Sequence, residues 1–195
     1  MTDIPSSPED FFQRFLPALI APHTEKLRGV TSAGAVVFLV GERAPVAIRL
    51  VDGALQRDTG VPDDALVQVR IASDADFAAL LEHAAPAFGS ATPDEKKLVA
   101  LRSLLIDGER AALVRGTQGS VALELVFPDC VRRIVLRPGA GPIGDAAECT
   151  VRIDAADFRA LQKGETNPFE LMMNGKLQIS GDAQILMSLS SLFLQ

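Results

Sequence analysis

The chain has 195 residues, of which 48% are hydrophobic and 23% charged, so it can bury a sizeable core and is not a disordered chain. A formal net charge of -6 and a pI near 4.9 argue against nucleic acid as a partner, because phosphate binding needs clustered Lys and Arg. No apolar run approaches the length of about 18 residues that crosses a bilayer, and the N-terminus lacks the pattern of a signal peptide. We therefore expect a soluble, cytoplasmic protein.

The first part of the chain predicts a helix, then strands, then a helix. A helix is expected over Pro8 to Leu27, with Ser7 as its cap and with kinks or breaks at Pro17 and Pro22. Further along, β-branched and apolar segments predict three strands, at Ala35–Val40, Val46–Val51 and Leu66–Ile71. Turns are expected at 41–45 and at Asp52-Gly53, and a second helix over Asp74 to His83.

A similar order of elements follows. The pattern predicts a helix over Pro93 to Leu105 and a helix over Ala155 to Gln162. Between them we expect strands at Ala111–Val114, Val121–Phe127, Val131–Arg137 and Cys149–Ile153, with a Gly/Pro-rich turn at Pro138–Gly144.

Two segments of the chain resemble each other directly. Val69-Arg70-Ile71 is followed by Asp76-Phe77, and Val151-Arg152-Ile153 is followed by Asp157-Phe158, with one residue of offset. This suggests an internal duplication with a boundary near residues 84–92, where Pro, Gly, Ser and Ala suit a connection. The alternative is that strand-to-helix junctions converge on such patterns by chance.

Short polar motifs punctuate the last part of the chain. Asn167-Pro168 disfavours helix at Asn167 and separates two short helices. Asn174-Gly175 ends the second of these, and Gly181-Asp182 ends a strand over 176–180 and can cap a helix over 183–194. These residues are interpreted as structural, and Lys176 as a solvated charge on the strand face opposite Leu177 and Ile179.

The order Val151-Arg152-Ile153, Asp157-Phe158, Gly164-Glu165-Thr166-Asn167-Pro168 and Gly175-Lys176-Leu177-Gln178-Ile179-Ser180-Gly181-Asp182 resembles the sterol carrier protein 2 family. The resemblance is strongest over residues 148–193. It implies an α+β fold, with a mostly antiparallel sheet covered by helices on one side, and an apolar tunnel that takes acyl chains, sterols or isoprenoids. Residues 1–90 would form a degenerate unit of this type, since they lack the Asn-Pro and Gly-Lys-Leu motifs, and residues 91–195 the lipid-binding unit.

The expected ligand-binding residues are the surplus apolar side chains of the last part of the chain. They are Phe158, Leu161, Phe169, Met172, Met173, Leu177, Ile179, Ile185, Leu186, Leu189 and Phe193. Such a stripe is by itself more typical of an ordinary core, and the resemblance is what favours a tunnel. The alternative is an interaction or dimerisation module whose tunnel is filled by side chains.

Residues that could carry catalysis are few. His23 and His83 are the only histidines and neither lies in a nucleophile motif. Cys130 and Cys149 lack metal-ligand spacing and are interpreted as reduced core residues, with a regulatory disulfide as the alternative. We expect no enzymatic activity, no cofactor and no metal. The expected partner is a lipid or other apolar small molecule, with transient membrane contact and oligomeric state left open.

Overall fold

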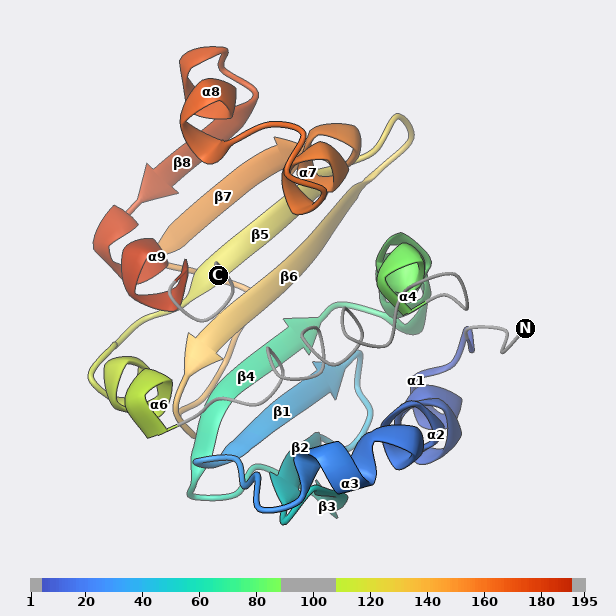
Figure 1. Ribbon diagram of the computed structural model, residues 1–195. Coiled ribbons are helices and arrows are strands. Elements are labelled where there is room, and N and C mark those ends of the chain that lie inside the picture. Colours follow the sequence, from blue (N-terminus) through green and yellow to red (C-terminus); the bar gives the residue numbers. More distant parts are fainter. Residues whose placement is uncertain (1–4, 89–107, 191–195) are drawn as a thin grey trace.

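The computed structural model describes residues 5–88 and 108–190, which are called the first and the second half below. All eight of the strands in these residues form one sheet, in the order β3-β2-β1-β4-β6-β5-β7-β8. Helices lie over one face of this sheet (Figure 1). Five of the seven strand pairs are antiparallel and two are parallel, which confirms the predicted α+β fold with a mostly antiparallel sheet.

The N-terminal helix is divided at its prolines, as predicted. Its parts are α1 (Pro8–Asp10), a π-helical turn (Phe11–Phe15), α2 (Leu16–Ile20), a 3-10 turn (Ala21–His23) and α3 (Thr24–Leu27). Ser7 caps the start, because its side chain accepts a hydrogen bond from the backbone N–H of Asp10. Pro17 has no N–H to donate to the preceding turn, so the helix widens to a π-turn just before it.

The first half of the sheet holds one more strand than the sequence indicated. Its elements are β1 (Ala35–Val40), β2 (Val46–Val51), β3 (Ala54–Thr59), β4 (Ala65–Ile71) and α4 (Asp74–Phe88). The three predicted strands are confirmed as β1, β2 and β4, the last with Ala65 added at its start. The sequence missed β3, because it is a polar edge strand without apolar alternation that pairs, among the described strands, with β2 alone. Asp52 and Gly53 both have positive φ and form the tight turn that the β2–β3 hairpin requires.

The second half repeats the alternation of strands and helices. Its elements are α6 (Gly108–Arg115), β5 (Val121–Val126), β6 (Val131–Pro138), β7 (Cys149–Asp154), α7 (Ala155–Gln162), α8 (Pro168–Met173), β8 (Leu177–Gly181) and α9 (Ala183–Ser190). The strand predicted at Ala111–Val114 is wrong, since these residues belong to α6. Ala111 and Val114 are both buried and lie three residues apart, which is helical spacing. The helix predicted at 93–105 lies outside the described residues.

The two halves of the sheet have the same local topology. In each, the first strand of a hairpin pairs in parallel with a later strand: β1 of the β1–β2 hairpin with β4, and β5 of the β5–β6 hairpin with β7. The first half differs in having β3 between the hairpin and the parallel strand. The segments Val69–Ile71 and Val151–Ile153, which resemble each other in sequence, lie in β4 and β7 and lead into α4 and α7. This is the arrangement that a duplication would produce, and the duplication and the two-unit division stay predictions.

The pairing of β4 with β6 makes the sheet continuous across the halves. The two strands are antiparallel, with Val69 opposite Leu136 and Ile71 opposite Ile134. The connection predicted near residues 84–92 starts later than expected, because α4 continues to Phe88, and residues 89–92 lie outside the described part.

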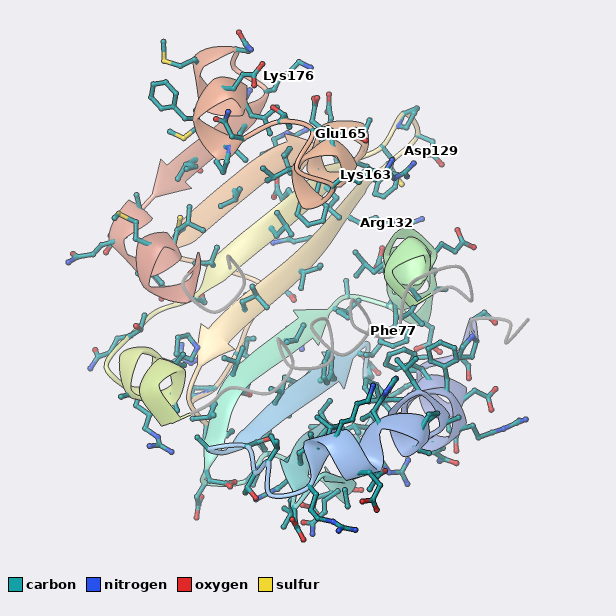
Figure 2. All side chains as sticks on the ribbon, viewed as in Figure 1. Phe77, Asp129, Arg132, Lys163, Glu165 and Lys176 are labelled. Atoms are coloured by element: carbon teal, nitrogen blue, oxygen red, sulfur yellow. The ribbon has the colours of Figure 1, made fainter. Side chains whose placement is uncertain are left out.

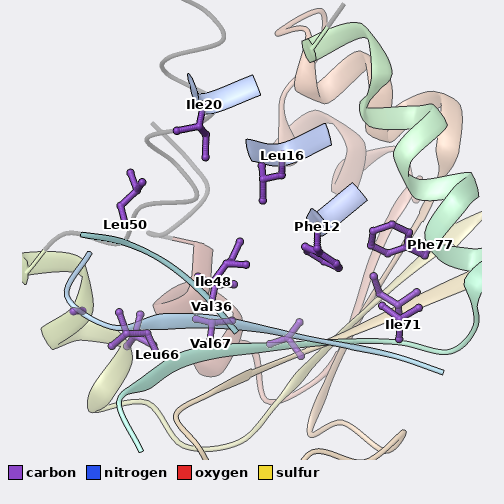
Figure 3. Packing of buried hydrophobic residues seen from close by; sticks show 14 of the residues in the cluster. Phe12, Leu16, Ile20, Val36, Ile48, Leu50, Leu66, Val67, Ile71 and Phe77 are labelled. Carbon is purple, nitrogen blue, oxygen red and sulfur yellow. The ribbon is translucent and has the colours of Figure 1, made fainter. Parts of the chain in front are cut away.

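The main hydrophobic core lies between the sheet and the helices (Figure 3). In the first half, Phe12, Leu16 and Ile20 of the N-terminal helical segment pack on the strands together with Phe77 of α4. Five phenylalanine rings meet here, with Phe12 lying 5.0 Å from Phe38 and 5.7 Å from Phe77 between ring centroids. Large aromatic side chains therefore fill the space between the helices and the sheet in this half.

The opposite face of the first half is built from small residues. Ala35, Val37, Ala47 and Ala65 form a separate buried cluster. Gln68 of β4 is buried on this side and donates hydrogen bonds to the carbonyl oxygens of Gly139 (2.8 Å) and Gly141 (2.5 Å). The turn at 138–144, predicted from its Gly and Pro content, is held against β4 in this way.

The two cysteines lie at opposite ends of β5. Cys149 is opposite Val121 at one end, and Cys130 pairs with Phe127 beyond the other end. Val121 and Phe127 are six residues apart along the strand, which places the two cysteines about 20 Å apart. A disulfide requires Cα atoms within about 7 Å of each other. Both thiols are free, and the alternative of a disulfide between them is wrong for this fold.

Candidate functional site

The sequence placed the candidate ligand residues on α7, α8, β8 and α9, and the structure divides them into three sets. The first set faces inward beneath α7. Phe158 and Leu161 of α7 and Leu177 of β8 pack on a cluster of buried residues. That cluster consists of Leu125 of β5, Ile153 of β7 and Leu171 of α8. Phe158, Leu161 and Leu177 themselves are only partly buried.

The second set faces inward beneath α9. Ile185 is buried, and Ile179 of β8 and Leu186 of α9 pack against the same main core. Ile185 closely approaches the chain before β5: a Cβ added at Gly119 would lie 2.6 Å from Ile185 Cδ1. Glycine at this position therefore lets α9 sit directly on the β5 end of the sheet.

The third set faces solvent. Phe169 is 72% exposed, Met172 49% and Met173 73%, although the sequence placed all three in the ligand lining. Leu171, between them in α8, is buried instead. The side chain of Leu189 and all of Phe193 lie outside the described residues. The ligand role of these five residues stays a prediction.

Local polar groups hold these elements in place, as the motif analysis predicted. Asn167 caps α8, since its side-chain oxygen accepts the backbone N–H of Glu170 at 2.9 Å. Asp182 caps α9 through the N–H of Gln184, also at 2.9 Å. Gly175 ends the α8 turn with a positive φ. Because these groups act on the backbone, they position the apolar side chains rather than contact a ligand.

The charged residues around α7 and α8 form pairs at the surface (Figure 2). Lys176 Nζ lies 2.9 Å from Asp157 Oδ1, and this carboxylate raises the pKa of Lys176. Lys163 Nζ lies 3.8 Å from Glu165 Oε1. Lys176 is exposed, as predicted, and it is in addition paired with Asp157 of α7.

A hydrogen-bonded carboxylate lies where β7 begins and α9 approaches. Glu148 Oε2 accepts hydrogen bonds from the backbone N–H and the hydroxyl of Ser120, both at 2.6 Å. Hydrogen bonds from the Ser120 hydroxyl, and from the backbone N–H groups of Glu148 and Ser120, hold the pKa of Glu148 below its usual value. Burial raises the pKa of the neighbouring Cys149 thiol, so Cys149 is held in its neutral form.

The other candidates for chemistry lie apart from the apolar site. His23 is buried in the 3-10 turn of the first half, and the side chain of His83 lies outside the described residues. No cluster of three or more metal-ligating side chains occurs within residues 5–88 and 108–190. Among the helices of these residues, none has the length and apolar character to cross a membrane.

Sequence reasoning missed the residues that form the floor of the site. Leu123 and Leu125 of β5 and Ile153 of β7 lie beneath α7, and Leu171 anchors α8 to them. Leu123 and Leu125 alternate along β5, so periodicity could have found them. Nothing local distinguishes Leu171 from the methionines that follow it, because its burial depends on how α8 is oriented.

Several solved structures are similar to part of this chain. Solved structures with similarity include sterol carrier protein 2 like 2 from Aedes aegypti (16% identity, TM-score 0.33, 49% of this chain and 93% of that chain). Sterol carrier protein domain 2 of Helicoverpa armigera also matches (21% identity, TM-score 0.35, 53% and 91% coverage). So does sterol carrier protein 2 from Yarrowia lipolytica (15% identity, TM-score 0.35, 44% and 73% coverage).

A search of curated protein sequences gave no match. The sequence model of the SCP-2 sterol transfer family, however, matches residues 97–194. That range contains α7, α8, β8 and α9 together with the strands on which they pack. The chain belongs to the SCP-2 sterol transfer family.

Proposed function

We propose that this protein is a non-enzymatic lipid carrier that holds one apolar ligand, a fatty acyl, sterol-like or isoprenoid molecule, in its second half. The observation that carries the proposal is the family match, which falls on the half where α7 and α9 cover the sheet with partly buried apolar side chains. The proposed lining is Phe158, Leu161, Leu177, Ile179, Ile185 and Leu186.

The contrast between the two halves supports a single site. In the first half, Phe12 is 2% exposed and Phe77 3%, and both rings lie within a cluster of phenylalanines in edge-on or tilted contact. A close-packed aromatic core leaves no room for an acyl chain without large rearrangement. The first half therefore acts as a scaffold whose strand β4 completes the sheet beside β6.

Apolar contact alone is enough for moderate affinity. At about 0.8 kcal/mol for each buried methylene, a chain with about ten of them buried contributes about 8 kcal/mol before the costs of association. We expect micromolar binding with low selectivity, which suits a protein that must also release its cargo.

The first test is native mass spectrometry of the freshly purified full chain, followed by organic extraction. We expect an adduct of one lipid per chain, or uptake of one molecule of added fatty acid or sterol. A clean mass without uptake would overturn the proposal and favour an interaction module with a filled core.

A pair of substitutions on one helix tests the location of the site. Ile185→Trp places a large ring where Ile185 is buried beneath α9, and we expect it to weaken ligand binding at least tenfold, about 1.4 kcal/mol. Met187→Trp is the control, because Met187 lies two residues away and is 73% exposed. Equal binding by both variants, with melting temperatures near the unsubstituted protein's, would place the site elsewhere.

A further inference from the structure

The short helix α8 exposes an unusual amount of apolar surface. Phe169, Met172 and Met173 follow the i, i+3, i+4 spacing that brings side chains to one side of a helix. They account for half of the large apolar side chains that are exposed within the described residues. Exposed apolar side chains that occur together, unlike scattered ones, are typical of an interaction surface.

The helix presents these side chains from a fixed position. Leu171 is 2% exposed and packs with Leu125 and Ile153, so one side of α8 is anchored in the core. The Asn167 cap fixes the start of the helix. The three exposed side chains therefore belong to an element that is fixed in place. This element, α8, lies at one end of the sheet (Figure 1).

The charges beside the helix are balanced. Lys176 pairs with Asp157, Lys163 pairs with Glu165, and Glu170 accepts a hydrogen bond from Thr166. With a net charge of -6 for the whole chain, this is not a surface that attracts anionic lipid. It suits a partner without net charge.

The size of the surface distinguishes a lipid from a protein partner. At about 200 Å² for each large side chain, the exposed parts of the three amount to roughly 400 Å². This is about half of the roughly 800 Å² that each partner buries in a stable protein complex. A few apolar side chains that project from an element are enough to enter the interface of a bilayer, which requires no complementary shape.

We propose that α8 docks the protein, through Phe169, Met172 and Met173, on the surface of membranes made of zwitterionic lipids, which carry no net charge. The inference deepens the proposed function, since a carrier must meet a membrane to exchange its cargo. The contact is reversible, because three side chains bury too little area for permanent anchoring.

The test is flotation of the full chain with phosphatidylcholine vesicles. We expect the protein to float with the vesicles, and the double variant Phe169→Ser/Met173→Ser to reduce the partition coefficient at least about tenfold. Met187→Ser is the matched control, because Met187 is also 73% exposed but belongs to α9, at the other end of β8 (Figure 1). Its partition should equal that of the unsubstituted protein.

Two further measurements separate the docking inference from the proposed function. Native mass spectrometry of the double variant should still detect the co-purifying lipid, so that loss of vesicle binding with retained cargo supports docking by α8. Raising the salt concentration should leave flotation unchanged, since the charges around α8 are already paired.

Three results would overturn the inference. One is equal flotation of the double variant and the unsubstituted protein. Another is a requirement for anionic lipid, which would assign docking to basic residues elsewhere. The third is a dimer of the unsubstituted protein that becomes monomeric in the double variant and never floats, which would make α8 an interface between two copies of the chain.

Discussion

Arg132 of β6 and Asp76 of α4 form an ion pair that joins the two halves of the protein, with Arg132 Nη1 2.7 Å from Asp76 Oδ1. The carboxylate raises the pKa of Arg132. Lys176 and Asp157 make the corresponding contact within the second half, and Asp76 and Asp157 occupy matching positions in the two similar segments. Thus β6 pairs with β4 much as β8 pairs with β7, and a strand of the second half continues the sheet of the first.

Removing the charge of Arg132 should loosen this junction. We expect Arg132→Met to lower the melting temperature by a few degrees, because Asp76, whose side chain is only 13% exposed, loses its cationic partner. Differential scanning calorimetry measures this. Arg14→Met is the control, since Arg14 and Asp10 form an exposed pair and its loss should leave the melting temperature unchanged. An equal effect of both variants would contradict a special role for the junction.

The phenylalanine cluster of the first half should dominate its stability. Phe12→Ala removes a ring that is 2% exposed and contacts three other rings, and we expect it to cost about 3–4 kcal/mol of the free energy of unfolding. Urea titration measures this cost. Phe169→Ala, at a 72% exposed ring, should change the free energy by less than about 0.5 kcal/mol. A small cost for Phe12→Ala would mean that the cluster is loosely packed.

Glycine at position 181 is required by close approach of the backbone. Its φ is +88°, and an added Cβ would overlap the carbonyl oxygen of Glu148. We expect Gly181→Ala to cost about 3 kcal/mol of unfolding free energy, since the β7–β8 pairing must shift. Gly175 also has a positive φ, but a Cβ added there would have no atom within 4 Å. Gly175→Ala should therefore cost only the backbone strain of about 1 kcal/mol. If chemical denaturation gave equal losses of unfolding free energy for the two variants, backbone strain rather than the contact with Glu148 would explain both.

Glu148 should make stability depend on pH. Because the folded state lowers the pKa of Glu148, its carboxylate stabilises the fold above the unfolded pKa of about 4.3, and this contribution is lost as the pH falls through the folded pKa. Glu148 is exposed, so we expect only about 1 kcal/mol for Glu148→Gln at neutral pH.

The measurement is the difference in melting temperature between Glu148→Gln and the unsubstituted protein at a series of pH values. This difference should shrink below about pH 4. A difference for Glu148→Gln that stays constant down to low pH would contradict the role of the charged form.

Much of the fold follows from local sequence. The ranges of β1 and β2 follow from β-branched apolar runs, and the break between α7 and α8 follows from Asn167-Pro168, because these signals act on the backbone within a few residues. The motifs of the second half also identified the family from the sequence, since several short matches in the correct order are more specific than any one of them.

What only the tertiary structure decided depends on neighbours distant in the chain. β3 is a strand because β2 lies beside it, and Ala111 and Val114 are helical because one face of α6 packs on the core. The position of β6 beside β4, and with it the Asp76–Arg132 pair, results from the pairing of two halves. For the site, the sequence identified apolar residues but not which of them face the core. Leu171 is buried and Phe169 is exposed because of how α8 is oriented against the sheet. That orientation depends on packing with residues distant in the chain rather than on local spacing.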